Sequence, residues 1–137
     1  MRVEVNFPDS ATIESHCKGL VVQTGLPPDH GGDPEALGPF DVLLCSLANC
    51  TGFHVLAFLE QRGLSSAQAG MTIEAGRSAE THLLDKISLQ IRVPDGFPEK
   101  YKDALVRAAG QCLVKAQLGQ QPEFDVEVVP AAYPTRS

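Results

Sequence analysis

One long apolar stretch near the middle of the chain constrains the fold more than any other feature. Residues 42–59 are apolar on nearly every side when they are placed on a helix. Pro39 suits the first position of such a helix, Asp41 suits the positive end of its dipole, and Arg62-Gly63 is a typical helix stop. The sequence therefore predicts a long buried helix. A sheet covers only one side of such a helix, so a second helix or a partner subunit must cover the other, and we expect a homodimer.

The segments on either side of this helix alternate polar and apolar residues, as strands do. Strands are predicted at residues 3–7, 11–17 and 20–22 before the helix and at 71–75 and 87–93 after it. Pro98 can begin a second helix with an apolar face that includes Cys112, Gly119 can end it, and a last strand is predicted at 126–128. The expected fold is a single α+β domain over residues 1–137 in the order βββ-α-ββ-α-β, with an antiparallel sheet and two main helices.

Charge and hydropathy argue against several classes of function. The net charge is −6 and there is no basic cluster, so we expect no nucleic-acid partner and no role at a membrane surface. Residues 42–59 are interrupted by polar side chains, which argues against a membrane span, and residues 1–9 do not resemble a signal peptide. The sequence therefore predicts a cytoplasmic protein.

The chain has 4 cysteines, at positions 17, 45, 50 and 112. In the cytosol such residues are more often free thiols than members of a disulfide framework. Cys45 precedes Cys50 by about 140° of helix rotation, so we expect Cys45 to face elsewhere and to belong to the core. Cys17 is expected to have a packing role.

Two segments resemble motifs of a known family. Leu37 to Thr51 reads LGPFDVLLCSLANCT and is similar to the first cysteine motif of the OsmC/Ohr family, the osmotically inducible and organic hydroperoxide resistance proteins. That motif runs from Gly-Pro through an acidic residue and an apolar helical run to Cys-Thr, and residues 53–64 continue the likeness. The second motif is a Cys followed by Pro, Val and often His or Ser, and here it reads Cys112-Leu113-Val114-Lys115. The element order also agrees, so the resemblance covers about residues 1–129.

The resemblance implies an OsmC-like, intertwined homodimer that acts as a thiol peroxidase on organic hydroperoxides. Carried over by position, Cys50 would be the peroxidatic thiol, Cys112 the resolving thiol, and Asp41 the family's acidic residue. A thiolate attacks the peroxide and becomes a sulfenic acid, the second thiol condenses with it to a disulfide, and an external dithiol restores both. This chemistry needs neither a metal nor an organic cofactor.

The sequence departs from the family pattern at two places. The proline after the second cysteine is absent, because Leu113 follows Cys112. Active members also use an arginine from the N-terminal strands, where this chain offers only Arg2 and Lys18. Lys115 lies three residues after Cys112, and its position alone makes it a candidate to replace that arginine as the cation of the site.

Two further residues have more than one interpretation. Asp41 precedes Cys50 by about 13.5 Å of helix rise, so it either serves a site across a dimer or complements the helix N-terminus. His54 lies one turn after Cys50 on the same helix face, where it can act on the thiol or simply pack in the core. Cys50, His54 and Cys112 are also residue types that zinc accepts, but their spacing is not diagnostic of a metal site.

A different class of function is compatible with the same scaffold. The chain can be a non-catalytic dimer that binds a small apolar ligand, with its cysteines acting as packing residues. The degraded second motif and the missing arginine motivate this alternative.

Overall fold

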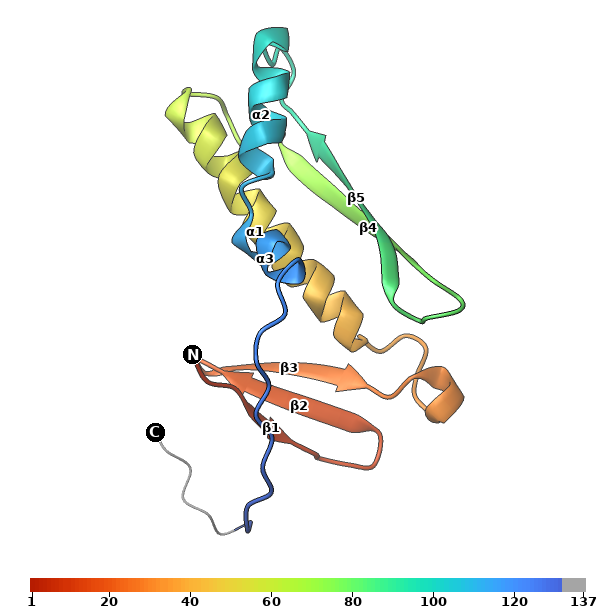
Figure 1. Ribbon diagram of the computed structural model, residues 1–137. Coiled ribbons are helices and arrows are strands. Elements are labelled where there is room, and N and C mark those ends of the chain that lie inside the picture. The colour runs from red at the N-terminus through yellow and green to blue at the C-terminus, as the bar shows by residue number, and fades with distance from the viewer. Residues whose placement is uncertain (132–137) are drawn as a thin grey trace.

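The computed structural model of the chain describes residues 1–131 (Figure 1). Three strands precede the long helix: β1 (Glu4–Asn6), β2 (Thr12–Cys17) and β3 (Leu20–Gly25), followed by the short 3-10 helix η1 (Pro28–His30). The long helix α1 (Pro39–Gln61) leads to β4 (Gly70–Arg77) and β5 (Leu84–Arg92). The 3-10 helix η2 (Glu99–Tyr101), α2 (Lys102–Ala109) and α3 (Leu113–Leu118) complete the order.

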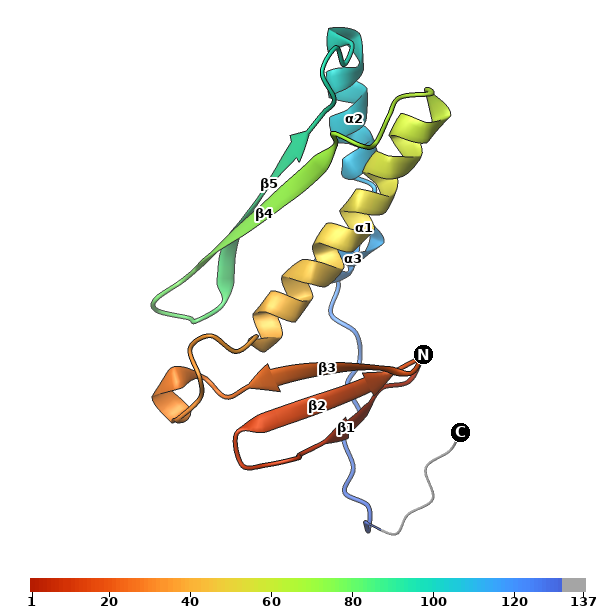
Figure 2. The same cartoon turned by 180° about the vertical axis from the view of Figure 1, so that it is seen from behind.

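The strands form two separate antiparallel sheets rather than one. β1, β2 and β3 make a meander, and β4 pairs only with β5. Lys18 and Gly19 form the turn between β2 and β3 with φ angles of 51° and 78°, the positive values that a two-residue hairpin turn requires. The α+β class and the antiparallel pairing predicted from the sequence are confirmed. Figures 1 and 2 show the β4–β5 hairpin along α1 and the three-stranded sheet near the N-terminal end of that helix.

The predicted start and stop of the long helix are both present. Pro39 is the first residue of α1 and Gly63 follows its end with a φ of 63°. The Leu64 N–H donates to the Leu59 carbonyl at 2.9 Å and the Gly63 N–H donates to the Glu60 carbonyl at 3.1 Å. These two bonds satisfy carbonyls that the helix end would otherwise leave without a partner.

The core lies between α1, α2 and the β4–β5 hairpin. Val55, Phe58 and Leu59 of α1 pack with Leu105 of α2, and Leu59 is 1% exposed. The opposite side of α1 is open, because the side chains at 46, 49, 53, 56 and 60 are exposed at helical spacing. Phe53 and Leu56, at 65% and 43% exposed, belong to this open stripe. One chain therefore covers only part of an almost wholly apolar helix.

By length and composition α1 is also able to cross a membrane, which the sequence analysis had argued against. Its best window has a mean hydropathy of 1.8, and 28% of that window is buried within the chain. The core helix of a water-soluble protein meets the same criteria. Since α1 packs against α2, α3 and β4, we describe it as a core helix.

The predicted second helix is wrong in one respect, because it is broken at Gly110–Cys112. α2 ends at Ala109, and Cys112 has φ −63° and ψ 119°, an extended conformation outside either helix. Glycine is a poor helix former, which favours a break at Gly110. Cys112 is consequently the N-cap of α3 rather than a residue on the face of a continuous helix.

The predicted last strand at 126–128 is absent. Residues 121–130 form neither helix nor strand, and their side chains are exposed. The segment does alternate polar and apolar residues, but its apolar side chains are not buried. Phe124, Val126 and Val128 are 75%, 87% and 100% exposed. A strand also needs a neighbour that supplies hydrogen bonds, and no pairing of this segment occurs among the described residues.

The start of α1 depends on Asp41, whose carboxylate oxygen Oδ2 accepts a hydrogen bond from the Gly38 N–H at 2.7 Å. We expect Asp41→Ala to lower the free energy of unfolding by about 1 kcal/mol, because the replacement removes this capping bond and a favourable charge at the helix N-terminus. Urea denaturation with Asp33→Ala as the matched loop control measures the effect. Equal stabilities of the two variants would contradict the capping role.

Candidate active site

The structure places Cys50 of α1 next to Cys112 of the α2–α3 connection. The Cys50 side chain lowers the pKa of the neighbouring Cys112 thiol. The two sulfurs differ in exposure, since Cys112 is 2% exposed and Cys50 remains partly accessible. Both are free thiols in this structure. The pair therefore consists of one accessible and one buried thiol that lie side by side.

The break between α2 and α3 orients the buried sulfur. As the N-cap residue of α3, Cys112 accepts a hydrogen bond on its sulfur from the Lys115 N–H at 3.3 Å. Thr51, which is 4% exposed, also lies beside this thiol and lowers its pKa. Cys112 is thus enclosed by α3 and by two consecutive residues of α1.

These contacts lower the pKa of the Cys112 thiol. Burial alone raises the pKa, because it disfavours the charged thiolate. Hydrogen bonds from the Cys50 thiol, the Lys115 N–H, the Thr51 hydroxyl and the Val114 N–H act in the opposite direction and outweigh burial. The pKa of Cys112 therefore lies below its ordinary value, and the thiolate forms more readily at neutral pH.

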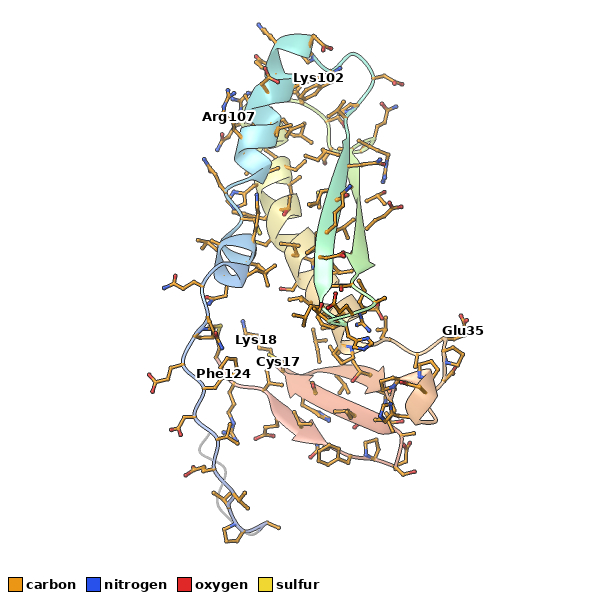
Figure 3. The ribbon with its side chains drawn as sticks, turned by 45° about the vertical axis from the view of Figure 1, so that its right-hand side comes forward. Cys17, Lys18, Glu35, Lys102, Arg107 and Phe124 are labelled. Carbon is orange, nitrogen blue, oxygen red and sulfur yellow. The ribbon has the colours of Figure 1, made fainter. Side chains whose placement is uncertain are left out.

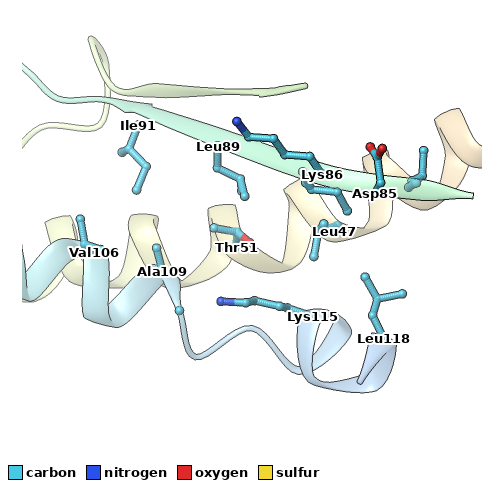
Figure 4. A pocket seen from close by; sticks show the side chains of 13 residues that line it. Leu47, Thr51, Asp85, Lys86, Leu89, Ile91, Val106, Ala109, Lys115 and Leu118 are labelled. Carbon is cyan, nitrogen blue, oxygen red and sulfur yellow. The ribbon is translucent and has the colours of Figure 1, made fainter. Parts of the chain in front are cut away.

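A cavity of about 480 Å³ lies between α1, β5, α2 and α3 (Figure 4). Its wall is mostly apolar, and it is formed by Leu47, Leu84, Ile87, Leu89, Ile91, Val106, Ala109, Gly110 and Leu118. The polar lining residues are Thr51, Asp85, Lys86 and Lys115. In Figure 4 the Lys115 side chain runs from α3 toward Ala109, below Thr51. Thr51 connects the cavity to the thiols, because it lines the cavity and lies beside Cys112.

The remaining candidate residues lie apart from this contact. Asp41 caps the start of α1, and His54 is partly buried with its ring 5.2 Å from that of Phe53. Within residues 1–131 no hydrogen bond joins His54 to either cysteine, and no group of three or more ligands is arranged for a metal ion. Arg2 pairs with Glu4 on the three-stranded sheet.

The prediction for Cys45 is wrong. It was expected in the core but is exposed, because it lies beside the open stripe of α1 that begins at residue 46. Cys17, partly buried at the end of β2, lies with Lys18 at the turn end of the three-stranded sheet (Figure 3). Sequence reasoning named Thr51 only as part of a motif, and its contact with Cys112 depends on tertiary packing that no local pattern reveals.

Comparison with known proteins identifies the relatives of this chain. The family model described as OsmC-like protein matches residues 31–127. A search of curated proteins found no match. Among solved structures, an osmotic stress induced and detoxification response protein from Psychrobacter arcticus has 19% identity and a TM-score of 0.73, with 84% of this chain and 85% of that chain covered.

Two further solved structures share the fold. An OsmC-like protein from Mycoplasma pneumoniae is 15% identical with a TM-score of 0.70, over 87% of this chain and 86% of that chain. An organic hydroperoxide resistance protein from Elizabethkingia anophelis is 13% identical with a TM-score of 0.62, over 88% and 90%. At these identities the likeness establishes the fold.

The lowered pKa of Cys112 predicts a pH-dependent contribution to stability. A thiol whose pKa is lower in the folded chain stabilises that chain fully above its unfolded value, near 9.0, and loses this contribution as pH falls through the folded value. The difference in free energy of unfolding between wild type and Cys112→Ser should therefore grow as pH rises toward 9. Urea denaturation of both proteins in reducing buffer at several pH values measures it. A difference that stays constant with pH would contradict the assignment.

Proposed function

This chain belongs to the OsmC-like protein family, and from that premise we propose that it is a thiol-dependent peroxidase that reduces organic hydroperoxides through Cys50 and Cys112. The family includes organic hydroperoxide resistance proteins among its solved structures, which supports a stress-related, peroxidase-like role at the level of the family. The observation that carries the proposal for this chain is the contact between an accessible thiol and a buried one.

The proposed reaction uses the two sulfurs in turn. Cys50, the accessible thiol, attacks the outer peroxide oxygen, which releases an alcohol and leaves a sulfenic acid on Cys50. The Cys112 sulfur then displaces the hydroxyl group to form a disulfide. An external dithiol of the cytoplasm returns both residues to the thiol state. The contact of the two thiols in the reduced protein supports this order, since disulfide formation requires close approach.

The cavity supports an organic rather than an inorganic peroxide as the substrate. Its volume of about 480 Å³ lies within the range of small-molecule sites, and its wall is predominantly apolar. The apolar body of a hydroperoxide can be buried against Leu89, Ile91 and Val106. Its peroxide end would then approach the thiols past Thr51, which borders both.

We further propose that the functional unit is a homodimer. α1 exposes an apolar stripe that includes Phe53 and Leu56, and the alternating segment around Val126 is fully exposed. Apolar surface of this extent is seldom left in water by a stable soluble protein. A second copy offers both an apolar face for α1 and a strand neighbour for residues 124–128.

The alternative of a non-catalytic, ligand-binding dimer also rests on an observation. Neither sulfur lines the described cavity, and Cys112 is almost completely buried. On this interpretation the cavity holds a small apolar molecule, Asp41 and His54 are structural, and the cysteines are packing residues. The two candidate functions differ in whether Cys50 reacts with peroxide.

The peroxidase proposal predicts that wild-type protein consumes cumene hydroperoxide with dithiothreitol as the reductant, while Cys50→Ser falls to the rate without protein, because the nucleophile is missing. Cys45→Ser is the matched control, since it removes an exposed thiol five residues away on the same helix. Peroxide loss is followed colorimetrically. Equal, slow consumption by wild type and Cys50→Ser, together with a co-purified apolar molecule in native mass spectrometry, would favour the ligand-binding alternative.

The dimer proposal predicts a native mass of twice the 14.7 kDa chain. Phe53→Glu should shift the protein toward monomer, because it places a charge in the middle of the proposed apolar contact. Lys100→Glu, a charge change on the exposed η2 segment, serves as the control. A wild-type protein that stays monomeric at micromolar concentration would overturn the proposal.

A further inference from the structure

We infer that the cavity between α1, β5, α2 and α3 binds an amphiphilic carboxylate, and that the Lys115 ammonium is the group that binds the charged end of this ligand. The inference deepens the proposed function by naming the ligand class of that cavity. It rests on the proposed function only where the ligand is called a substrate, because binding can be measured without peroxide.

The composition of the cavity wall is the first observation. The wall is apolar except at Thr51, which is neutral, and at the charged residues Asp85, Lys86 and Lys115. Burial of an apolar chain against such a wall is favourable, and a volume of about 480 Å³ accommodates a small organic molecule. Two cations and one anion leave an excess of positive charge. The lining therefore fits a molecule with an apolar body and one negatively charged group.

The placement of Lys115 is the second observation. Its backbone N–H donates to the Cys112 sulfur at 3.3 Å, which holds the residue at the start of α3 beside the buried thiol. Its side chain lines the cavity and runs toward Ala109, below Thr51 (Figure 4). The backbone and the side chain of Lys115 therefore have separate surroundings. A change of the side chain removes the ammonium from the cavity and keeps the N–H that caps Cys112.

The third observation is that the Lys115 ammonium has no carboxylate partner within residues 1–131. The ion pairs in this part of the chain are formed by four other cations, namely Arg2, His16, His30 and Lys102. Asp85, the acid of the cavity wall, takes part in none of these pairs. A neutral ligand that covered the ammonium would remove its water without supplying a partner, which is unfavourable. A carboxylate supplies both the opposite charge and hydrogen-bond acceptors.

Lys86 is the other cation of the cavity wall, but its charge is partly offset. It follows Asp85 directly on β5, and opposite charges on neighbouring residues attract a distant anion only weakly. α3 contains no acidic residue, so the charge of Lys115 has no such neighbour on its own helix. The chain as a whole carries a net charge of −6, which disfavours the approach of an anion. The attraction for a carboxylate must therefore be local, and we assign it to Lys115.

The test is isothermal titration calorimetry of the reduced protein with octanoate and with 1-octanol, which have the same chain length and differ in charge. We expect the wild type to bind octanoate more tightly than 1-octanol. Lys115→Met should weaken octanoate binding by about fivefold, which corresponds to about 1 kcal/mol for a partly exposed ion pair, and should leave the affinity for 1-octanol unchanged. Lys115→Arg keeps the positive charge and should keep the preference for octanoate.

Arg107→Met is the matched control, because it removes a positive charge from an exposed position on the outer side of α2 that does not line the cavity (Figure 3). A second measurement needs no variant. Added salt should weaken the binding of octanoate to the wild type and not that of 1-octanol, because salt screens the ion pair. The inference is overturned if octanoate does not bind, if the wild type binds both ligands equally, or if Lys115→Met and Arg107→Met weaken octanoate binding to the same extent.

Turnover separates this inference from the proposed function. The wild type and Arg107→Met should have a lower KM for the hydroperoxide of oleic acid than for that of its methyl ester, and Lys115→Met should lose this difference. If octanoate binds as expected but no hydroperoxide is consumed, the carboxylate site stands and the peroxidase is lost. If acid and ester are consumed alike and octanoate binds no better than 1-octanol, the peroxidase stands and the carboxylate site is lost.

Discussion

The burial of α1 is the constraint on which the rest of this structure depends. The helix is apolar on nearly all sides, and transfer of such surfaces out of water is the main favourable term in folding. Within one chain α2, α3 and β4 cover only part of it, leaving the stripe that includes Phe53 and Leu56 in contact with solvent. The same packing sets Cys50 and Thr51 against the α2–α3 connection. The fold, the candidate site and the proposed dimer are therefore all consequences of how this helix is covered.

The chemistry of the site arises from the way a helix begins. A continuous helix through Cys112 would have left its sulfur as one more apolar contact on a packed face. The break after Ala109 instead makes Cys112 the N-cap of α3, where the Lys115 N–H has no partner within the helix and donates to the sulfur. The Lys115 N–H, which would otherwise lack an acceptor, therefore stabilises the thiolate of Cys112.

Much of the fold was predictable because the signals are local. Alternation predicted the strands of both sheets, and Pro39 and Gly63 marked the ends of α1. The break at Gly110–Cys112, the exposure of Cys45 and the missing strand at 126–128 were not predictable, because each depends on what lies beside the segment in space. Resemblance to a family pointed to Cys50 and Cys112, whereas the cavity and the position of Thr51 beside Cys112 appear only once α1, β5 and α3 are packed.

Assigning attack and resolution to sulfurs of unequal exposure has a chemical advantage. A thiolate that is stabilised by several hydrogen bonds is present at neutral pH, but the same stabilisation makes it a weaker nucleophile. An accessible thiol without those donors is a stronger nucleophile once it is ionised, but it is seldom ionised at neutral pH. In the proposed reaction Cys50 is the sulfur that a hydroperoxide can reach, and the more easily ionised Cys112 follows it as the resolving thiol. The burial of Cys112 then protects this thiolate from reaction with solvent oxidants until the sulfenic acid has formed beside it.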